Sequence, residues 1–504
     1  MQGIKDYQEK LFLNFRLSEH VPKENFYRRL KDTLDLSYLR GLTKIYYGSE
    51  GQKSIDTEVF FKLMLIGYLE NINSDRQIIE IAKMRMDMLY FLGYNLDESL
   101  PWHSTLSRTR KLFGEEVFLE LFRNILRLCI DKGMVSGKTQ AVDSAFIKAN
   151  ASMESLVERE LIQQSKQFLT ELTENEDNSS ERKKKYSERF VSTTDPDARV
   201  RKKPNKPQSL NHLGIISVDT ENHVICGAVV DFADKVDSDT TGKIVGQAVE
   251  NLQQIGLEVE EVLADTGYSS GASYKVLEKK NIIAYIPTIS GYKPKKDGFT
   301  YSEKEDCYTC SQGIKLPFRG VKKEKNRKTL TKQYRSTLAD CRGCPLKEEC
   351  CKKANYKEVS HSFDKLYYDK AYRLLNTRKG KQKMRLRAKT VEPVWGTLLD
   401  FRRMRKVYTK GNDLANKQLL MAATAYNLKK LLGFSPIKST AKAIKATVMT
   451  AKNIFIKQLF VELDLIPYFV EQVLWNLKLL NAKTNYELVL KEQLCNSHHR
   501  PVPM

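Results

Sequence analysis

The chain has no long apolar run, and its histidines form no catalytic pattern. The best apolar stretch, 59–66, is short and contains Lys62, so the sequence predicts no membrane span. The first residues turn polar at once and lack the apolar segment of a secretory signal, so we expect a cytoplasmic protein. The seven histidines belong to no evident Ser-His-Asp arrangement, and no phosphate-binding glycine loop is visible.

Positive charge is the most informative feature of the composition. The 504 residues include 84 lysines and arginines against 62 aspartates and glutamates, which leaves a net charge of +22. A hydrophobic content of 41% is that of a folded protein, and the length suits two or three domains. Solubility alone would explain many charges. Because the basic residues cluster, however, a polyanionic partner such as nucleic acid is favoured.

Three acidic residues are the candidates for catalysis. Asp143 and Asp265 each end a short apolar run with the character of a strand, and Glu392 lies in a segment rich in arginine and lysine. Carboxylates gathered by a fold are the ligands that Mg²⁺ or Mn²⁺ requires, and two such ions roughly 3.5–4 Å apart cut phosphodiesters. The sequence therefore predicts metal-assisted chemistry on nucleic acid.

Other aspartates compete for the same role. Asp219 and Asp231 also end strands, and Asp195 and Asp197 lie in a loop. Turn and capping roles are the usual fate of such residues, and Asp219 is the main substitute for Asp143.

Residues 1–135 are predicted to form a helical domain. Apolar spacing indicates helices over 57–69 and 115–130, a capping box at Ser74–Gln77 opens another, and Ser104 is expected to cap a further short helix. That short helix follows a tight turn and is polar and basic at its start, which suits a helix-turn-helix reader of DNA. The alternative is an ordinary solvated face. Its candidate DNA contacts are Ser104, Thr105, Arg108, Arg110 and Lys111.

From about residue 136 to 435 the pattern changes to a mixed α/β layer with a partly antiparallel sheet. Strands are predicted at 139–146, 212–218, 223–230, 259–264 and 281–286, with helices at 238–252, 273–278, 393–406 and 414–432. Two insertions, at about 151–210 and 290–375, interrupt this layer. The first is charged, as at Glu181–Lys185, and is either solvated or a clamp for phosphates. A basic, amphipathic tail spans 436–504.

Cysteines cluster in the second insertion. Cys307 and Cys310, then Cys341 and Cys344, have the paired spacing of a structural zinc site, which would have no catalytic role. The alternative is that some of them are small buried thiols.

Around the three carboxylates the chain resembles a known family, the DDE transposases of bacterial insertion sequences. The similar segments are Ala141–Asn150, Asp265–Tyr268, Val391–Gly396, the helical stretches 63–67 and 101–108, and the helix 421–428. The resemblance implies an RNase H-like mixed sheet with flanking helices, an all-α N-terminal domain and a cysteine-rich insertion. It also implies that Asp143, Asp265 and Glu392 hold two Mg²⁺ ions. Element ends and target would be double-stranded DNA, bound by a homo-oligomer in the bacterial cytoplasm.

The segment around Glu392 departs from the family pattern. Relatives often place a tyrosine, an arginine and a lysine at positions that here are Arg385, Ala388 and Leu399. The basic residues that would replace this signature in contacting DNA are Arg385, Arg387, Lys389, Arg402 and Arg403. Because proline suits the first turn of a helix, Pro393 predicts that Glu392 lies at a helix start. The remaining alternatives are a nuclease that cuts without joining and a DNA-binding protein that has lost activity.

Overall fold

The computed structural model describes residues 5, 15–48, 50–51, 53–158, 189–201, 207–289, 291–323 and 330–435. One compact unit ends at Phe434, and Ser435–Met504 forms a second. The predicted tail, the basic run Glu181–Lys185 and the stretch 202–204 lie outside the described residues. No helix among those described is long and apolar enough to cross a membrane.

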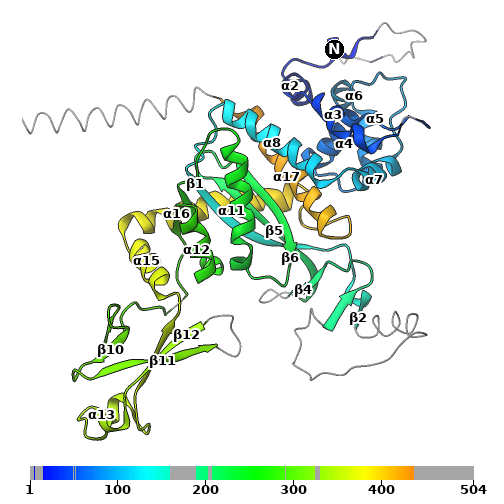
Figure 1. Ribbon diagram of the computed structural model, residues 1–504. Helices are drawn as coiled ribbons and strands as arrows, with labels where there is room; N and C mark the ends of the chain where they lie inside the picture. The colour runs from blue at the N-terminus through cyan, green and yellow to red at the C-terminus, as the bar shows by residue number, and fades with distance from the viewer. Residues whose placement is uncertain are drawn as a thin grey trace, which may run out of the picture. The chain divides into compact units, whose positions relative to one another are not determined.

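The N-terminal part of the chain is helical, as predicted (Figure 1). Its elements are α1 (Leu17–His20), α2 (Phe26–Thr33), α3 (Tyr38–Thr43), η1 (Lys44–Tyr46), α4 (Thr57–Leu69), α5 (Asp75–Met84), α6 (Met86–Leu92), α7 (His103–Leu112) and α8 (Glu115–Asp131). Ser74 caps α5 by accepting a hydrogen bond from the Gln77 backbone N–H. The capping role predicted for Ser104 is wrong, because α7 begins one residue earlier and the Ser104 hydroxyl accepts from Arg108 instead.

A six-stranded mixed sheet follows, in the order β4-β5-β1-β7-β8 with β6 also paired to β5. The strands are β1 (Thr139–Lys148), β4 (Arg199–Arg201), β5 (Ser209–Asp219), β6 (Ile225–Phe232), β7 (Glu261–Leu263) and β8 (Ile283–Tyr285). β5 runs antiparallel to β1 and β6, whereas β7 is parallel to both β1 and β8. The mixed α/β prediction is therefore confirmed, including the hairpin between β5 and β6. A small ribbon pairs β2 (Leu156–Glu158), which follows η2 (Met153–Ser155), with β3 (Phe190–Ser192).

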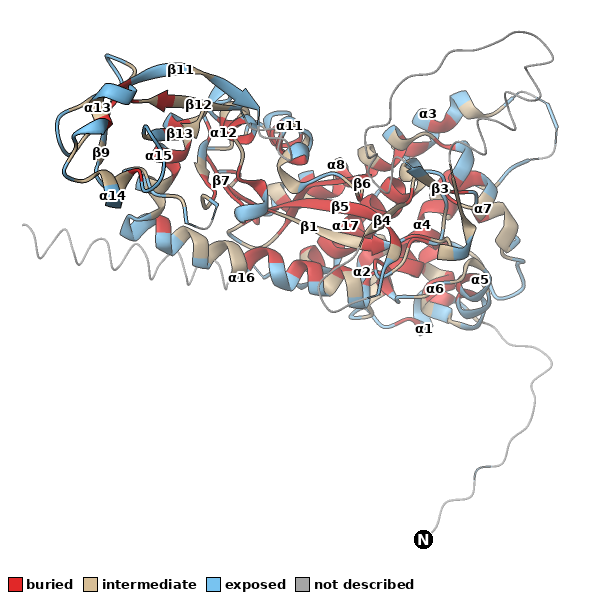
Figure 2. Cartoon of the chain, turned by 90° about the horizontal axis from the view of Figure 1, so that it is seen from below, coloured by how far each residue is buried: buried red, intermediate tan, exposed pale blue. Residues whose placement is uncertain are grey.

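Helices cover both faces of the sheet. On one side, α11 (Asp237–Gln253), α12 (Gly271–Lys279) and α15 (Lys365–Leu375) pack against residues such as Val142 and Ile215. On the other side lie α8, α16 (Arg378–Phe401) and α17 (Asn412–Gly433), which share one apolar core with the N-terminal helices. Strands β5, β6 and β7 are almost wholly buried, whereas β1 is buried only over its first half (Figure 2).

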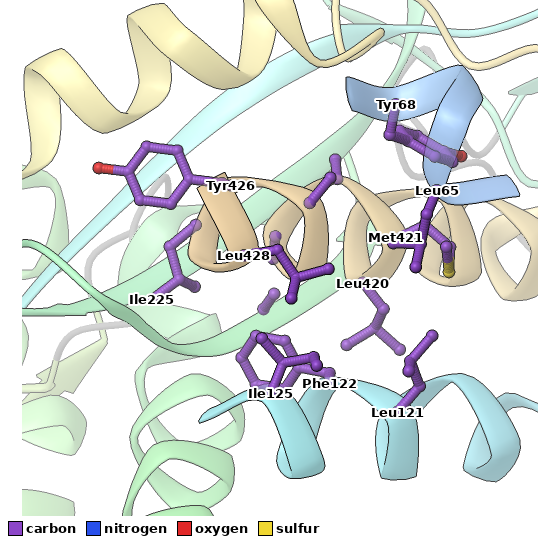
Figure 3. Packing of buried hydrophobic residues seen from close by; sticks show 14 of the residues in the cluster. Leu65, Tyr68, Leu121, Phe122, Ile125, Ile225, Leu420, Met421, Tyr426 and Leu428 are labelled. Atoms are coloured by element: carbon purple, nitrogen blue, oxygen red, sulfur yellow. The ribbon is translucent and has the colours of Figure 1, made fainter. Parts of the chain in front are cut away.

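Helix α17 is buried along nearly its whole length. Figure 3 shows Leu420 and Leu428 facing α8, while Met421 faces Leu65 of α4. Two of its asparagines close the edge strand β6: Asn427 exchanges two hydrogen bonds with the Ile225 backbone, and Asn416 accepts from the Val230 N–H. Side chains thus satisfy backbone groups that an edge strand would otherwise leave exposed.

The second insertion forms its own antiparallel sheet, in the order β13-β12-β11-β10-β9. Its elements are β9 (Phe299–Ser302), β10 (Cys307–Cys310), β11 (Lys315–Lys323), β12 (Leu330–Arg335), α13 (Leu338–Arg342), α14 (Lys347–Cys350) and β13 (Glu358–Ser362). Aromatic residues, among them Tyr308 and Tyr334 in edge-to-face contact, form its small core.

The prediction that Glu392 and Pro393 begin a helix is wrong. Helix α16 starts at Arg378, where the Thr377 hydroxyl accepts from the Gly380 N–H, and Pro393 lies inside it. Val391, Val394 and Leu398 pack into the core and keep the helix continuous past the proline. Apolar burial along α16 therefore outweighs the local preference of proline for a first turn.

We expect Asn427→Ala to lower the free energy of unfolding by about 3 kcal/mol, because it leaves the buried Ile225 N–H and C=O without partners. Urea denaturation measures this loss. Asn95→Ala, at an exposed position, is the matched control and should change stability little. Equal effects of the two substitutions would contradict the role of Asn427 in completing the hydrogen bonds of β6.

Candidate catalytic site

Two of the three predicted carboxylates lie next to each other in the sheet. Asp143 is in β1, and Asp265 follows β7, the parallel neighbour of β1. Because Ala141 pairs with Leu263, the two aspartates stand at the same level, each two residues further along its strand. Parallel pairing therefore brings together two residues that are far apart in the sequence.

A guanidinium from α16 bridges this pair. Arg387 Nη2 lies 2.9 Å from Asp143 Oδ1 and 3.9 Å from Asp265 Oδ2. The Arg387 side chain is largely buried, and its Nε has no hydrogen-bond partner among the described residues. One helical turn earlier on α16, Lys383 pairs with Glu261 at the start of β7. The helix thus places two cations, one turn apart, against the interior strands β7 and β1.

Burial is the largest influence on the pKa of Asp143. It raises the pKa of the carboxyl from 3.8 to about 6, although Arg387 opposes the shift; Asp265 and Asp237 add to it by repulsion. A carboxyl with this pKa is readily deprotonated when a cation arrives at neutral pH.

A third carboxylate joins the pair from α11, and the sequence argument missed it. Asp237 accepts a hydrogen bond from the Ser144 hydroxyl at 2.6 Å, and burial raises its pKa. A Cβ placed on Gly267 would lie 2.5 Å from Asp237 Oδ2 and 3.0 Å from Asp265 Oδ1, so these two oxygens face each other across the glycine. The available signal was an aspartate directly before the predicted helix 238–252.

Glu392 does not join this cluster. It is exposed on α16 and has no hydrogen bond or ion pair within the described ranges. Five residues separate it from Arg387, a rotation of about 140° on a helix with 3.6 residues per turn. The face of α16 that meets the aspartates therefore presents Arg387 rather than Glu392.

The donor set suits Mg²⁺ or Mn²⁺ in kind, since it consists of carboxylate oxygens held within β1 and just after β7. In the part of the chain that is described, however, no three His, Cys, Asp or Glu side chains are grouped closely enough to hold a metal ion. Asp143 and Asp265 provide two ligands, and the positive charge between them belongs to Arg387.

The rival aspartates have structural partners. Asp219 accepts hydrogen bonds from Gly137 N–H, Ser136 and Gln140 at the start of β1, before the strand reaches Asp143. Asp195 holds His212 and the Gly411 N–H, Asp197 accepts from the Asn412 N–H, and Asp231 pairs with Lys235.

The predicted DNA-contacting residues divide into exposed and buried groups. Arg108, Lys111, Arg385 and Lys389 are exposed, whereas Ser104 and Thr105 are half-buried. Arg110 is buried and pairs with Asp75, and Arg402 and Arg403 are buried behind α16. The sequence did not indicate this burial, because each of these arginines lies in a polar stretch.

The eight described cysteines are all free thiols. Cys307 and Cys310 lie in β10, while Cys341 contacts Ser336. Burial, together with Cys341 and Cys350, raises the pKa of Cys351 to about 12. Zinc binding by Cys307, Cys310, Cys341 and Cys344 stays a prediction.

Two family models match the chain. A transposase domain (DUF772) covers residues 15–112, which correspond to the N-terminal helices, and a transposase DDE domain covers 309–432. The second range includes Arg387 and Glu392 but neither Asp143 nor Asp265. No curated protein gives a significant match.

Two solved structures show limited similarity. The piggyBac transposase synaptic complex with hairpin DNA is 10% identical, with 81% of this chain and 75% of that chain covered at a TM-score of 0.27. The Mos1 transposase paired-end complex with left transposon end is 11% identical, with coverage of 49% and 63% and a TM-score of 0.15. At these scores neither structure supports a conclusion about fold or function.

Stability in the absence of metal should depend on the titration of Asp143. Because folding raises its pKa from 3.8 to about 6, the folded state holds this proton more tightly. The resulting stabilisation is complete below about pH 4 and is lost as pH rises to about 6, a loss of at most about 3 kcal/mol.

Asp143→Asn removes this titration. In EDTA, wild type should therefore lose stability relative to the variant between about pH 4 and pH 7, as measured by urea denaturation. Asp400→Asn, an exposed change on α16, should follow the wild-type profile. Parallel profiles for wild type and Asp143→Asn would contradict the raised pKa.

Proposed function

We propose that the chain is a DNA transposase of the DDE type found in insertion sequences, with Asp143, Asp265 and Glu392 as its catalytic carboxylates. The observation that carries the proposal is the pairing of Asp143 with Asp265 around one cationic group. A fold that buries like charges side by side must compensate them, and a divalent cation does so in a working site. Glu392 is included for its place in the segment Val391–Gly396.

Mg²⁺ or Mn²⁺ bound here would activate the attacking water or 3′-hydroxyl and stabilise the leaving oxygen. Asp143 and Asp265 would hold it through short side chains fixed on strands. Asp237 adds a further negative charge beside Asp265 and is held in orientation by Ser144. Arg387 neutralises part of this charge in the metal-free protein, and its own flexible side chain allows it to turn toward a DNA phosphate.

We also propose that the sheet is RNase H-like. Three antiparallel strands, β6, β5 and β1, continue into two parallel strands, β7 and β8, and the aspartates lie on adjacent central strands. The order, directions and acidic positions together support this assignment.

The partners follow from the reaction. Double-stranded DNA would supply both the element ends and the target, with the exposed Arg108, Lys111, Arg385 and Lys389 contacting its backbone. Joining two ends in one event requires that both be held together, so a homo-oligomer on DNA is proposed.

Two alternatives remain specific enough to test. An RNase H-like nuclease or resolvase would cut without joining. A degenerate DNA-binding protein would do neither, and the altered positions Ala388 and Leu399 favour it to the extent that their usual residues are needed.

The test uses duplexes from the inverted repeats that flank the gene, incubated with the full chain and Mg²⁺ or Mn²⁺. We expect metal-dependent cleavage and joining by wild type. Asp143→Asn and Asp265→Asn should lower both by at least about a thousandfold, because each removes a charge from a cation ligand while leaving DNA binding nearly unchanged. Labelled products on denaturing gels measure the two steps separately.

Glu392→Gln and Asp237→Asn identify the third carboxylate. A loss as large as that of Asp143→Asn for Glu392→Gln supports the triad, whereas full activity in that variant contradicts it. Asp400→Asn, exposed on the same helix, is the matched control and should retain activity. Cleavage without joining would establish the nuclease, and DNA binding by wild type without cleavage would establish the inactive relative.

A further inference from the structure

A second cationic site lies where the N-terminal helices meet the loop between α16 and α17. It is a pocket of about 580 Å³, whose lining comes from α4, the start of α5, α7, the loop and α17. Its charged lining residues are Asp75, Arg110, Lys111, Arg403 and Lys410.

Arg403 is the most unusual of these residues. Its backbone is left-handed, with φ +61°, and only 5% of its surface is exposed. The guanidinium carbon lies 4.9 Å from the ring centroid of Tyr68 and 5.6 Å from that of Tyr408, and Nη2 donates to the Asn73 carbonyl. Nε and Nη1 have no hydrogen-bond partner among the described residues. A buried guanidinium with two unsatisfied nitrogens is costly unless a ligand pairs with it.

The other charges of the pocket do not satisfy this arginine. Asp75 is the lone carboxylate in the described lining, and it pairs with Arg110 at 2.8 Å. Arg403, Lys111 and Lys410 have no ion pair within the described ranges, so three positive charges remain without a counter-charge. Desolvation lowers the pKa of Arg403 and Arg110 lowers it further, while Tyr68 and Asp75 oppose the shift without cancelling it.

Helix α5 reinforces the positive potential. Asn73, Ser74 and Asp75, at its N-terminus, line the pocket, and a ten-residue helix carries partial positive charge at that end. Gly67 allows the close approach of Arg403, because a Cβ there would lie 2.7 Å from Nη1. The pocket thus combines unpaired guanidinium donors, a helix start and two exposed lysines, as phosphate sites do.

We propose that this pocket binds a backbone phosphate of the DNA on which the protein acts, with Arg403 as the central contact and Lys111 and Lys410 as outer contacts. The assignment of this phosphate to DNA rests on the proposed function. Inorganic phosphate shares the recognised chemistry, and the experiment separates the two sources. Arg110 would orient the α7 side of the pocket through its pair with Asp75.

The experiment measures binding of the end duplex by fluorescence anisotropy over a range of salt concentrations. Lys410→Gln should weaken binding about tenfold and reduce the slope of log K against log salt by about one, whereas Arg403→Lys should weaken binding about tenfold with little change in slope. Arg403→Lys keeps the charge but loses the fork, so its loss is expected mainly in affinity. Arg405→Gln, an exposed loop residue paired with Asp400, is the charge-matched control and should change affinity less than twofold.

Duplexes with a single neutral methylphosphonate locate the contact. At one backbone position this substitution should weaken wild type about tenfold and have no further effect on Lys410→Gln or Arg403→Lys. Additive losses at every position would overturn the proposal, and Lys410→Gln decides the question even if Arg403→Lys does not fold.

A second experiment measures the shift in melting temperature that inorganic phosphate causes. Stabilisation by phosphate that is lost in Arg403→Lys, together with unchanged DNA binding, would assign the pocket to a free anion and overturn the DNA assignment. No response to phosphate or DNA would make Arg403 a structural residue. A position-specific methylphosphonate effect in a protein that neither cuts nor joins would uphold the pocket while the proposed catalytic role fails.

Discussion

The burial of α17 is the constraint on which the rest of the structure depends. This one helix fills the space between the sheet, α8 and the N-terminal helices, so that all three share a single core. Its polar residues are as important as its apolar ones. Asn416 and Asn427 complete the hydrogen bonding of β6, while Gln418 holds the carbonyls of Arg403 and Lys406 and the N–H of Tyr408. The helix therefore fixes both the edge strand β6 and the loop between α16 and α17.

Charge compensation is the second constraint, and it acts at the centre of the sheet. Placing Asp143 and Asp265 on adjacent strands, with Asp237 close to Asp265, concentrates negative charge where water is partly excluded. A single guanidinium cannot neutralise three carboxylates, so the cluster retains a net attraction for cations. Because the Nε of Arg387 also has no partner among the described residues, the hydrogen bonding of the cluster is not saturated. Both features suit a site that is completed by an ion and a phosphate.

Local pattern predicted much of this fold, because strand alternation and helical periodicity depend on near neighbours. The strands carrying Asp143 and Asp265, the hairpin at Asp219 and the helix before Asp265 all followed from such patterns. The contact of Asp237 with Ser144 could not be predicted, since it joins elements 93 residues apart. The register of α16 was also missed: its start at Arg378 and its apolar face decide which residue meets the aspartates, whereas Pro393 suggested a later start.

The basic residues also could not be placed from local sequence pattern alone. A cluster of arginines indicates a polyanionic partner, but the sequence does not say which of them reach the surface. Arg403 is buried between two tyrosine rings, and its loop is bonded to the end of β1, where Lys148 accepts from the Val407 N–H. The strand that carries Asp143 and the loop that carries Arg403 are therefore one hydrogen-bonded piece. A phosphate bound in the pocket would lie at a fixed position relative to the aspartates. This positioning would explain why the protein keeps a buried arginine that destabilises the fold.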